Sequence, residues 1–142
     1  MEPYRYCLTV RIFHPSMNPD EITENIGIEP DTTRMVGDQR INPKGKLLEG
    51  VWPKSLWAYQ PHKEERLFSN DQYLEDYISD LTNELSMHKE YFSYIVDTGG
   101  KIEYFVGLFS EYSIGSEFNP DLLRIMGELN IGLSLDIYAY NE

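Results

Sequence analysis

Hydrophobic and polar residues alternate from the start of the chain. One side of an extended chain carries Tyr4, Tyr6, Leu8, Val10 and Ile12, and the other side carries Arg5, Cys7, Thr9, Arg11 and Phe13. A period of two with one apolar side and one mixed side is typical of a strand that covers a hydrophobic core. The first element is therefore predicted to be a half-buried strand.

Three later segments also predict strands. Residues 55–59 are rich in aromatic side chains, which favour strands. Residues 101–112 alternate between apolar and mixed positions. The last predicted strand covers residues 132–140, and its Leu135 and Ile137 are expected to face the helices.

Helix starts are marked by the same three residues at two places. Residues 18–20 and 119–121 both read Asn-Pro-Asp, with Asn suited to the N-cap, Pro to the first helical position and Asp to the first turn. The first of these helices is expected to end at Gly27 and Pro30. Between the two, apolar residues at steps of three and four over residues 74–95 predict one helix or two consecutive helices.

The two Asn-Pro-Asp segments belong to a longer internal similarity, because each follows a predicted strand and leads to Asn-Ile-Gly, at residues 25–27 and 130–132. The Asn-to-Asn separation is 7 residues in the first copy and 11 in the second, a difference of about one helical turn of ~3.6 residues. One interpretation is that Asn-Pro-Asp is simply a common helix start. The other is a duplicated strand–helix–strand unit, which predicts an α+β fold: a ferredoxin-like two-layer sandwich with a four-stranded, mainly antiparallel sheet and helices on one face.

Residues 29–54 lack periodicity and contain three prolines and three glycines. They also carry five of the twelve basic residues. A stretch of this length without regular structure is uncommon in a compact domain and is usually functional or partly disordered. We therefore expect one domain over residues 1–142, with a long irregular basic loop at about 29–54.

The composition fits a single globular domain, because 142 residues are close to the ~150 of a typical domain. Twenty-four acidic and twelve basic residues give a net charge of −12, which disfavours nucleic acid and anionic membranes as partners. One cysteine cannot form an internal disulfide, which fits a reducing compartment. Neither a signal peptide nor an apolar run of the ~18 residues that span a membrane is found, so a cytoplasmic location is expected.

The sequence contains no recognised catalytic, metal or cofactor motif. The three histidines, His14, His62 and His88, lack metal-ligand spacing. Cys7 and His14 would lie roughly 23 Å apart along one strand at ~3.3 Å per residue, too far for a nucleophile and its base. Gly-x-Ser-x-Gly, Walker A and Gly-x-Gly-x-x-Gly patterns are missing. We therefore expect no catalytic residue, no metal and no cofactor, and an enzyme is the less favoured interpretation.

The basic loop supplies the first candidate binding site. Arg34, Arg40, Lys44 and Lys46 place guanidinium and ammonium donors beside glycines, whose backbone N–H groups can approach a ligand. Such a segment can hold a phosphate, a carboxylate or an acidic segment of a partner. Alternatively, these cations neutralise the protein's own acids or remain in solvent.

The second candidate is the face of the sheet that points away from the helices. The residues expected there include Arg11, Phe13, Trp57, Phe105, Phe109, Tyr138 and Tyr140. Arginines among aromatic rings resemble the platforms that stack RNA bases, but the net charge of −12 argues against that use. Either the 29–54 loop covers this face as a second small core, or the face is exposed and marks a surface for a protein partner or a dimer.

Short motifs at residues 18–23 and 26–32, Gly37-Asp38, the strand around Trp57 and residues 135–138 are spread over most of the chain. Together they resemble the bacterial family catalogued as domain of unknown function 4279. The resemblance implies a small bacterial α+β domain. It implies no established activity, catalytic residue or cofactor.

These observations predict a binding module that engages a protein partner, or a second copy of itself, through the aromatic sheet face, the basic loop or both. The alternative is a hydrolase or transferase for a small anionic substrate, with Arg34, Arg40 and Lys46 as anion clamps and a carboxylate as base. A third interpretation is an immunity-type inhibitor that uses its acidic charge to block a basic toxin.

Overall fold

The structure, a computed structural model, describes residues 2–139, which form eight strands and four α-helices. The strands are β1 (Arg5–His14), β2 (Thr32–Arg34), β3 (Gln39–Ile41), β4 (Leu47–Val51), β5 (Ser55–Tyr59), β6 (Leu67–Phe68), β7 (Lys101–Ser110) and β8 (Ile131–Ala139). The helices are α1 (Pro19–Ile26), α2 (Leu74–Leu85), α3 (Lys89–Asp97) and α4 (Pro120–Glu128), with a short 3₁₀ helix, η1 (Ser86–His88), between α2 and α3. The four strands predicted from the sequence are confirmed, with ends that differ by at most two residues. Within residues 2–139, the helices are too short or too polar to cross a membrane.

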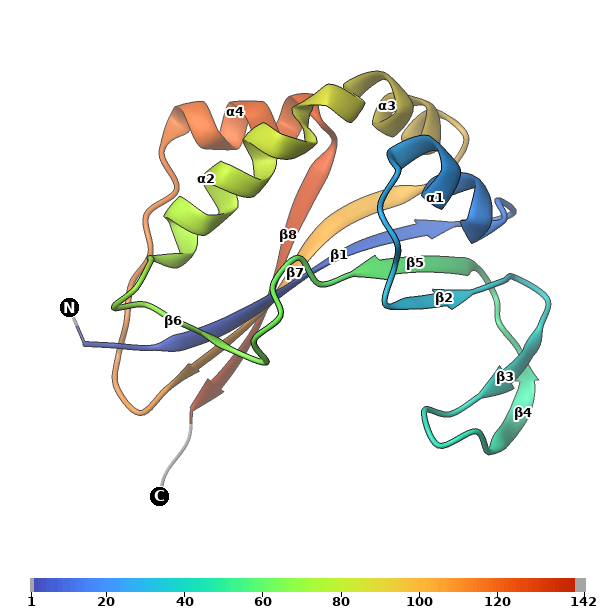
Figure 1. Cartoon of the computed structure of the whole chain (residues 1–142), viewed down its shortest axis with the longest axis horizontal. Helices are drawn as coiled ribbons and strands as arrows, with labels where there is room; N and C mark the ends of the chain where they lie inside the picture. Colours follow the sequence, from blue (N-terminus) through green and yellow to red (C-terminus); the bar gives the residue numbers. More distant parts are fainter. Residues whose placement is uncertain (1, 140–142) are drawn as a thin grey trace.

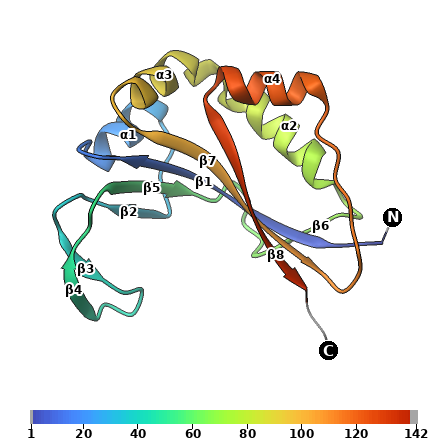
Figure 2. The same ribbon diagram turned by 180° about the vertical axis from the view of Figure 1, so that it is seen from behind.

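Six strands form the main sheet, in the order β2-β5-β1-β7-β8, with β6 also pairing with β1. All of these pairings are antiparallel except β7–β8, which is parallel. β3 and β4 form a separate two-stranded hairpin. Figures 1 and 2 show the four helices on one side of the main sheet and the hairpin projecting beyond the other side. The α+β class with one helical layer is therefore confirmed.

The four-stranded ferredoxin-like arrangement is not confirmed. The main sheet has six strands, and the two strand–helix–strand units differ, because β8 pairs directly with β7 whereas β5 lies between β1 and β2. Residues 29–54, expected to be irregular, supply β2 at the sheet edge and the β3–β4 hairpin. Strands of two to five residues contain too few positions for a period of two to show.

The central strands β1 and β7 divide the molecule into two sides. Every second residue of β1 from Tyr6 to Ile12 is buried, and the register opposes Leu8 to Val106 and Ile12 to Ile102. Apolar residues from all four helices close the core over this side. Burying one such side chain contributes about 1.5–3 kcal/mol, so the alternation along β1 determines which side of the sheet the helices cover.

Both Asn-Pro-Asp segments begin helices, as predicted. The Asn18 side chain accepts a hydrogen bond from the Asp20 backbone N–H at 2.9 Å, and the Asn119 side chain accepts one from the Leu122 N–H at 2.9 Å. Helix α1 ends at Gly27, whose φ of 77° lies in the left-handed region that favours glycine. Each asparagine cap contributes ~1 kcal/mol.

His62 fills a gap on the outer edge of β1. β6 pairs with the start of β1 and β5 with its second half. Between them, the Leu8 backbone N–H donates to Nε2 of His62 at 3.1 Å. The other ring nitrogen then carries the proton and donates to the Glu64 carbonyl at 2.6 Å. His62 therefore acts as a side-chain extension of the β1 hydrogen-bond ladder.

His14 ties the end of β1 to the segments around α1 and α3. Its side chain is buried, Nδ1 accepts hydrogen bonds from the backbone N–H groups of Ser16 and Met17, and Nε2 donates to Oγ1 of Thr98 at 2.8 Å. These bonds require a neutral ring. Burial lowers the pKa of His14 below its ordinary value of 6.5.

We expect this histidine to make folding stability depend on pH. As the pH falls through ~6.5, unfolded His14 takes up a proton that the buried ring does not, so stability falls by up to about 1.4 kcal/mol per pH unit until the lower folded pKa is reached. Urea unfolding of the protein and of His14→Gln between about pH 7 and pH 5.5 measures the effect. The variant should lose less stability on acidification, and equal slopes would contradict the assignment.

The turn between α3 and β7 leaves no room for a side chain at Gly100. A Cβ there would lie 2.5 Å from Cγ2 of Ile95 and 2.8 Å from its carbonyl oxygen. Gly100→Ala is therefore expected to destabilise the protein by about 1–3 kcal/mol in urea denaturation. Gly115→Ala is the matched control, because a Cβ at Gly115 meets nothing within 4 Å. Equal losses in the two variants would exclude the steric explanation.

Candidate functional site

The helix-distal side of the main sheet, called the open face below, gathers cations and aromatic rings. Directly paired residues share one face of a sheet, so the strand registers identify its members. They are Thr32 and Arg34 of β2, Leu56 and Ala58 of β5, Arg5, Cys7, Thr9, Arg11 and Phe13 of β1, Phe68 of β6, Lys101, Glu103, Phe105, Gly107 and Phe109 of β7, and Gly132, Ser134, Asp136 and Tyr138 of β8. Figure 1 shows that all four helices lie on the other side.

Arginines stack on the rings of the open face. Arg5 lies over Phe68, Arg11 over Phe105 and Arg66 over Phe109, with the guanidinium carbons 4.4, 4.0 and 3.7 Å from the ring centroids. Phe109 also stacks on Tyr138, with centroids 4.8 Å apart and ring planes inclined by 6°. Each such contact between a cation and a ring contributes about 0.5–1 kcal/mol at an exposed site. A guanidinium held over a ring loses part of its freedom and can still form hydrogen bonds through N–H groups that point away from the ring.

A buried carboxylate anchors the cations in the middle of the open face. The Glu103 side chain is 5% exposed, and its Oε2 accepts a hydrogen bond from Nη2 of Arg11 at 2.9 Å. Its Oε1 lies 3.3 Å from Nζ of Lys101, whose side chain is 70% exposed. Arg11 is thus fixed between a carboxylate and a ring.

A pocket forms where the base of the hairpin meets the open face. This hairpin pocket has a volume of about 410 Å³ and is lined by Phe13, Arg34, Arg40, Val51, Trp52, Pro53, Lys54 and Leu56. The half-buried Trp52 ring lies 4.1 Å from the guanidinium carbon of Arg34 and 5.4 Å from that of Arg40. Nζ of Lys54 lies 4.8 Å from the Phe13 ring. The pocket therefore combines apolar ring surfaces with three cations.

Backbone hydrogen bonds hold Trp52 in this position. The Gly37 N–H donates to the Trp52 carbonyl and the Trp52 N–H donates to the Asp38 carbonyl, both at 2.9 Å. Gly37 has a φ of 86°, in the left-handed region that favours glycine. The Val36 N–H donates to Oγ of Ser55 at 3.1 Å, which ties the same turn to β5. The hairpin is thus anchored to the sheet at its base.

The hairpin covers only one end of the open face. It meets that face around Phe13 and Leu56. Farther along the sheet, Phe105 and Phe109 remain partly exposed, and Tyr138 is 49% exposed. The greater part of the open face is therefore accessible surface and not a second closed core.

Two of the four predicted anion-binding residues come together in the structure. Arg34 and Arg40 share the hairpin pocket. Lys44 and Lys46 lie at the exposed tip of the hairpin, where their backbone N–H groups donate to Oδ1 of Asn42. The cations of the basic segment therefore form two separate groups.

The predicted residues of the sheet face are distributed differently. The structure places Arg11, Phe13, Phe105, Phe109 and Tyr138 on the open face. The expectation for Trp57 is wrong, because Trp57 pairs with Ile12 on the helical side, is 1% exposed and donates from Nε1 to Oγ1 of Thr23 at 3.0 Å. Tyr140 lies outside the described residues.

Among the residues that contribute to the surface without being predicted from the sequence are Trp52, Arg66 and Phe68. Trp52 is the sole aromatic residue of the basic segment 29–54. A single ring among five cations is a signal that points to stacking, and it could identify this residue from the sequence. Phe68 belongs to the two-residue strand β6, and Arg66 directly precedes it. Two residues show no periodicity, so the sequence carries no comparable signal for these positions.

Charge is divided between the two sides of the molecule. The four α-helices carry eleven acidic residues and two basic residues, a formal charge of −9. Seven of the twelve basic residues lie on the open face or in and beside the hairpin pocket: Arg5, Arg11, Arg34, Arg40, Lys54, Arg66 and Lys101. The protein thus has an acidic helical side and a cationic, aromatic side.

The Tyr138 hydroxyl is a titratable group of the open face that forms a hydrogen bond. The Tyr138 hydroxyl donates to Oδ2 of Asp136 at 3.2 Å, and this carboxylate raises the pKa of Tyr138. Tyr138 therefore stays protonated at neutral pH and presents a hydroxyl. Within residues 2–139, no group of three or more His, Cys, Asp and Glu side chains is arranged to hold a metal ion.

Fold and surface together describe a small α+β protein with a cationic, aromatic sheet face as its candidate binding site. The family model described as "Domain of unknown function (DUF4279)" matches residues 2–140, and the chain belongs to this family. No curated protein and no solved structure matches the chain.

The role of Glu103 as an anchor predicts unequal effects of two substitutions. Glu103→Gln leaves Arg11 and Lys101 without their carboxylate and is expected to destabilise the protein by about 1–2 kcal/mol, below the usual loss for a fully buried pair because both cations reach solvent. Lys101→Gln removes an exposed partner and should cost less than about 1 kcal/mol. Urea denaturation measures both, and an equal or smaller loss for Glu103→Gln would show that Glu103 is not the anchor.

Proposed function

We propose that this protein is a non-enzymatic interaction module of the cytoplasm that binds an acidic segment of a partner protein on its open face. The observation that carries the proposal is the gathering of seven cations and six rings on one side of a protein with a net charge of −12. The hairpin pocket is the proposed anchor, because three cations and the rings of Phe13 and Trp52 line one cavity there.

The ring-stacked arginines suit this role. A guanidinium that is already oriented by a ring loses less conformational freedom when it binds a carboxylate. Tryptophan and arginine are also enriched among the residues that dominate protein–protein binding. In the hairpin pocket, a carboxylate can bind Arg34 or Arg40 bidentately while an apolar neighbour in the same segment packs on Trp52.

An acidic peptide segment fits this surface better than a nucleic acid does. A long polyanion experiences the charge of the whole protein, including the −9 of the helices, and that charge opposes association. A short segment that approaches from the open face meets mainly the local cations, because charges beyond the ~8 Å Debye length are screened at physiological salt.

The two alternative functions have weaker support. For an enzyme acting on a small anion, Lys46 lies at the hairpin tip away from Arg34 and Arg40, and the residues lining the hairpin pocket include neither a carboxylate nor a histidine to act as base. An immunity-type inhibitor would use the acidic helical side instead. The interaction module and the inhibitor therefore place their partners on opposite sides of the molecule.

Charge reversal in the hairpin pocket tests the proposal. The double variant Arg34→Glu/Arg40→Glu should bind a synthetic peptide of alternating glutamate and phenylalanine at least about tenfold more weakly, because repulsion replaces attraction at two positions. Lys44→Glu/Lys46→Glu makes the same charge change at the hairpin tip and should weaken binding less than about threefold. Tryptophan fluorescence follows binding, because Trp52 is half-buried in the pocket while Trp57 is buried in the core.

Thermal unfolding distinguishes the alternatives. A ligand at ~100 times its Kd stabilises the folded state by about 2.7 kcal/mol. A peptide at millimolar concentration that leaves Tm unchanged contradicts the proposal. A rise in Tm with pyrophosphate or with a single-stranded oligonucleotide, but not with the peptide, would favour a small-anion or nucleic-acid site instead. Equal weakening in the two double variants would show that the hairpin pocket is not the anchor.

A further inference from the structure

Strand β8 forms a long unpaired edge of the main sheet. Within the described part of the chain, β8 pairs with β7 and no other strand, over all nine of its residues. The opposite edge is β2, which has only three residues and leads into the hairpin. An edge strand presents free backbone N–H and C=O groups that form a template for another strand.

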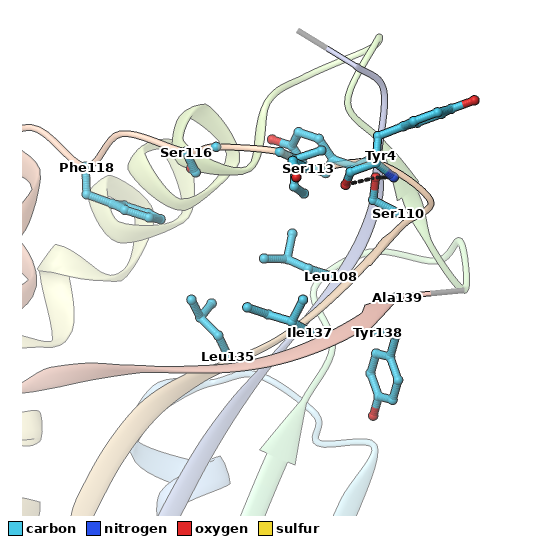
Figure 3. A pocket seen from close by; sticks show the side chains of 13 residues that line it. Tyr4, Leu108, Ser110, Ser113, Ser116, Phe118, Leu135, Ile137, Tyr138 and Ala139 are labelled. Atoms are coloured by element: carbon cyan, nitrogen blue, oxygen red, sulfur yellow. Dashed lines mark hydrogen bonds between the residues drawn. The ribbon is translucent and has the colours of Figure 1, made fainter. Parts of the chain in front are cut away.

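The sequence of β8 lacks the usual protection of such an edge. Residues 131–139 contain no lysine, arginine or proline, and Asp136 is their one charged residue. Leu135 and Ile137 point to the helical side of the sheet but are 43% and 72% exposed. In Figure 3 they project, with Leu108, into a groove of about 400 Å³ beneath the loop that bears Ser113 and Phe118. Exposed apolar residues along a free edge are typical of a strand that pairs with another chain.

We infer that the occupant of this edge is a second copy of the chain, whose β8 pairs antiparallel with the first about a two-fold axis at Leu135. In this register Leu135 faces its own copy, Ile137 faces Leu133 and Ile131 faces Ala139. The polar side matches equally well, because Asp136 faces Ser134 and Tyr138 faces Gly132. All nine residues of β8 are paired, and apolar residues meet apolar ones on the helical side.

Neighbouring symmetric registers are less favourable. Residues that lie directly opposite each other are on the same face of the sheet. In a symmetric pairing the two-fold axis therefore passes through one residue of β8, and the possible registers differ in which residue that is. An axis at Asp136 sets two carboxylates directly against each other, and like charges in that position are destabilising. An axis at Ser134 leaves Tyr138 and Ala139 unpaired. The axis at Leu135 avoids the Asp136 pair and pairs all nine residues of β8, and a symmetric pairing of this kind requires a second copy of this chain.

This pairing joins the open faces of two molecules. A two-fold axis between antiparallel strands of one sheet runs perpendicular to the sheet, so both helical layers lie on one side and both open faces on the other. The stacked pair Phe109 and Tyr138 then lies near the junction, since both residues are on the open face at the β8 edge. The dimer does not use the residues of the hairpin pocket, so failure of either proposal is distinguishable from failure of the other.

Sedimentation equilibrium of the full chain tests the association. We expect a species of twice the 16.6 kDa chain mass at micromolar concentration. Leu135→Lys and Ile137→Lys should each raise the dimer dissociation constant at least about tenfold, because they replace one side of the apolar pairs Leu135–Leu135 and Ile137–Leu133 with a cation. Met87→Lys is the matched control: Met87 is 80% exposed but belongs to η1 in the helical layer and not to β8, and the change should leave the constant unaltered. A monomer at 100 micromolar, or equal effects of all three substitutions, would overturn the inference.

Disulfide cross-linking tests the register, in a Cys7→Ala background. Leu135→Cys places two cysteines directly opposite, with Cβ atoms ~4.5–5.5 Å apart, so oxidation should link the dimer readily. Ile137→Cys is more exposed, but its copies would be four residues apart along the strands, roughly 14 Å. Faster cross-linking through residue 137 than through residue 135 would exclude the register, whatever the oligomeric state.

Discussion

The antiparallel pairing of β1 with β7 is the constraint on which the two sides of this molecule depend. Nine consecutive residues of β1 pair with β7, and paired residues share a face. One register therefore sends Leu8 and Val106 into the helical core and sends Arg11 and Glu103 to the open face. A slip of one residue would bury the cations beneath the helices and expose the apolar set, so burial of the core also maintains the candidate binding surface.

Stacking and pairing explain how a strongly acidic protein keeps a cationic face. Unsupported cations would be drawn toward the many carboxylates of the chain, yet the guanidinium groups of Arg5, Arg11 and Arg66 lie over rings of this side of the sheet. Glu103 adds a buried negative charge that holds Arg11 in place. The acids of the helices lie across the sheet from these groups, so the molecule carries a charge asymmetry that orients an approaching anion toward the open face.

Alternation makes the long strands, and the residues facing each way on them, predictable from the sequence. The same reasoning fails at β5, where Leu56, Trp57 and Ala58 are all buried and no alternation shows which way Trp57 points. It also fails for the hairpin pocket, because Trp52 meets Arg34 only after the chain has passed through the β3–β4 hairpin. Contacts of that kind depend on tertiary structure, and short strands offer too few positions for periodicity to reveal them.

The two edges of the main sheet, β2 and β8, differ in structure, and the difference bears on the proposed function. The hairpin that follows β2 places a cationic pocket near one edge, whereas β8 leaves the other edge unpaired within the described residues, and this is the edge of the proposed dimer. In the proposed dimer the pockets lie at the two far ends of one continuous sheet. A partner with a single acidic segment would gain little from this arrangement. A partner with two such segments, joined by a chain long enough to reach both pockets, would bind the second one intramolecularly, and the gain in avidity can reach ~10²–10⁴-fold without any new contact. The proposed dimer would therefore favour partners that carry repeated acidic segments over partners that carry one.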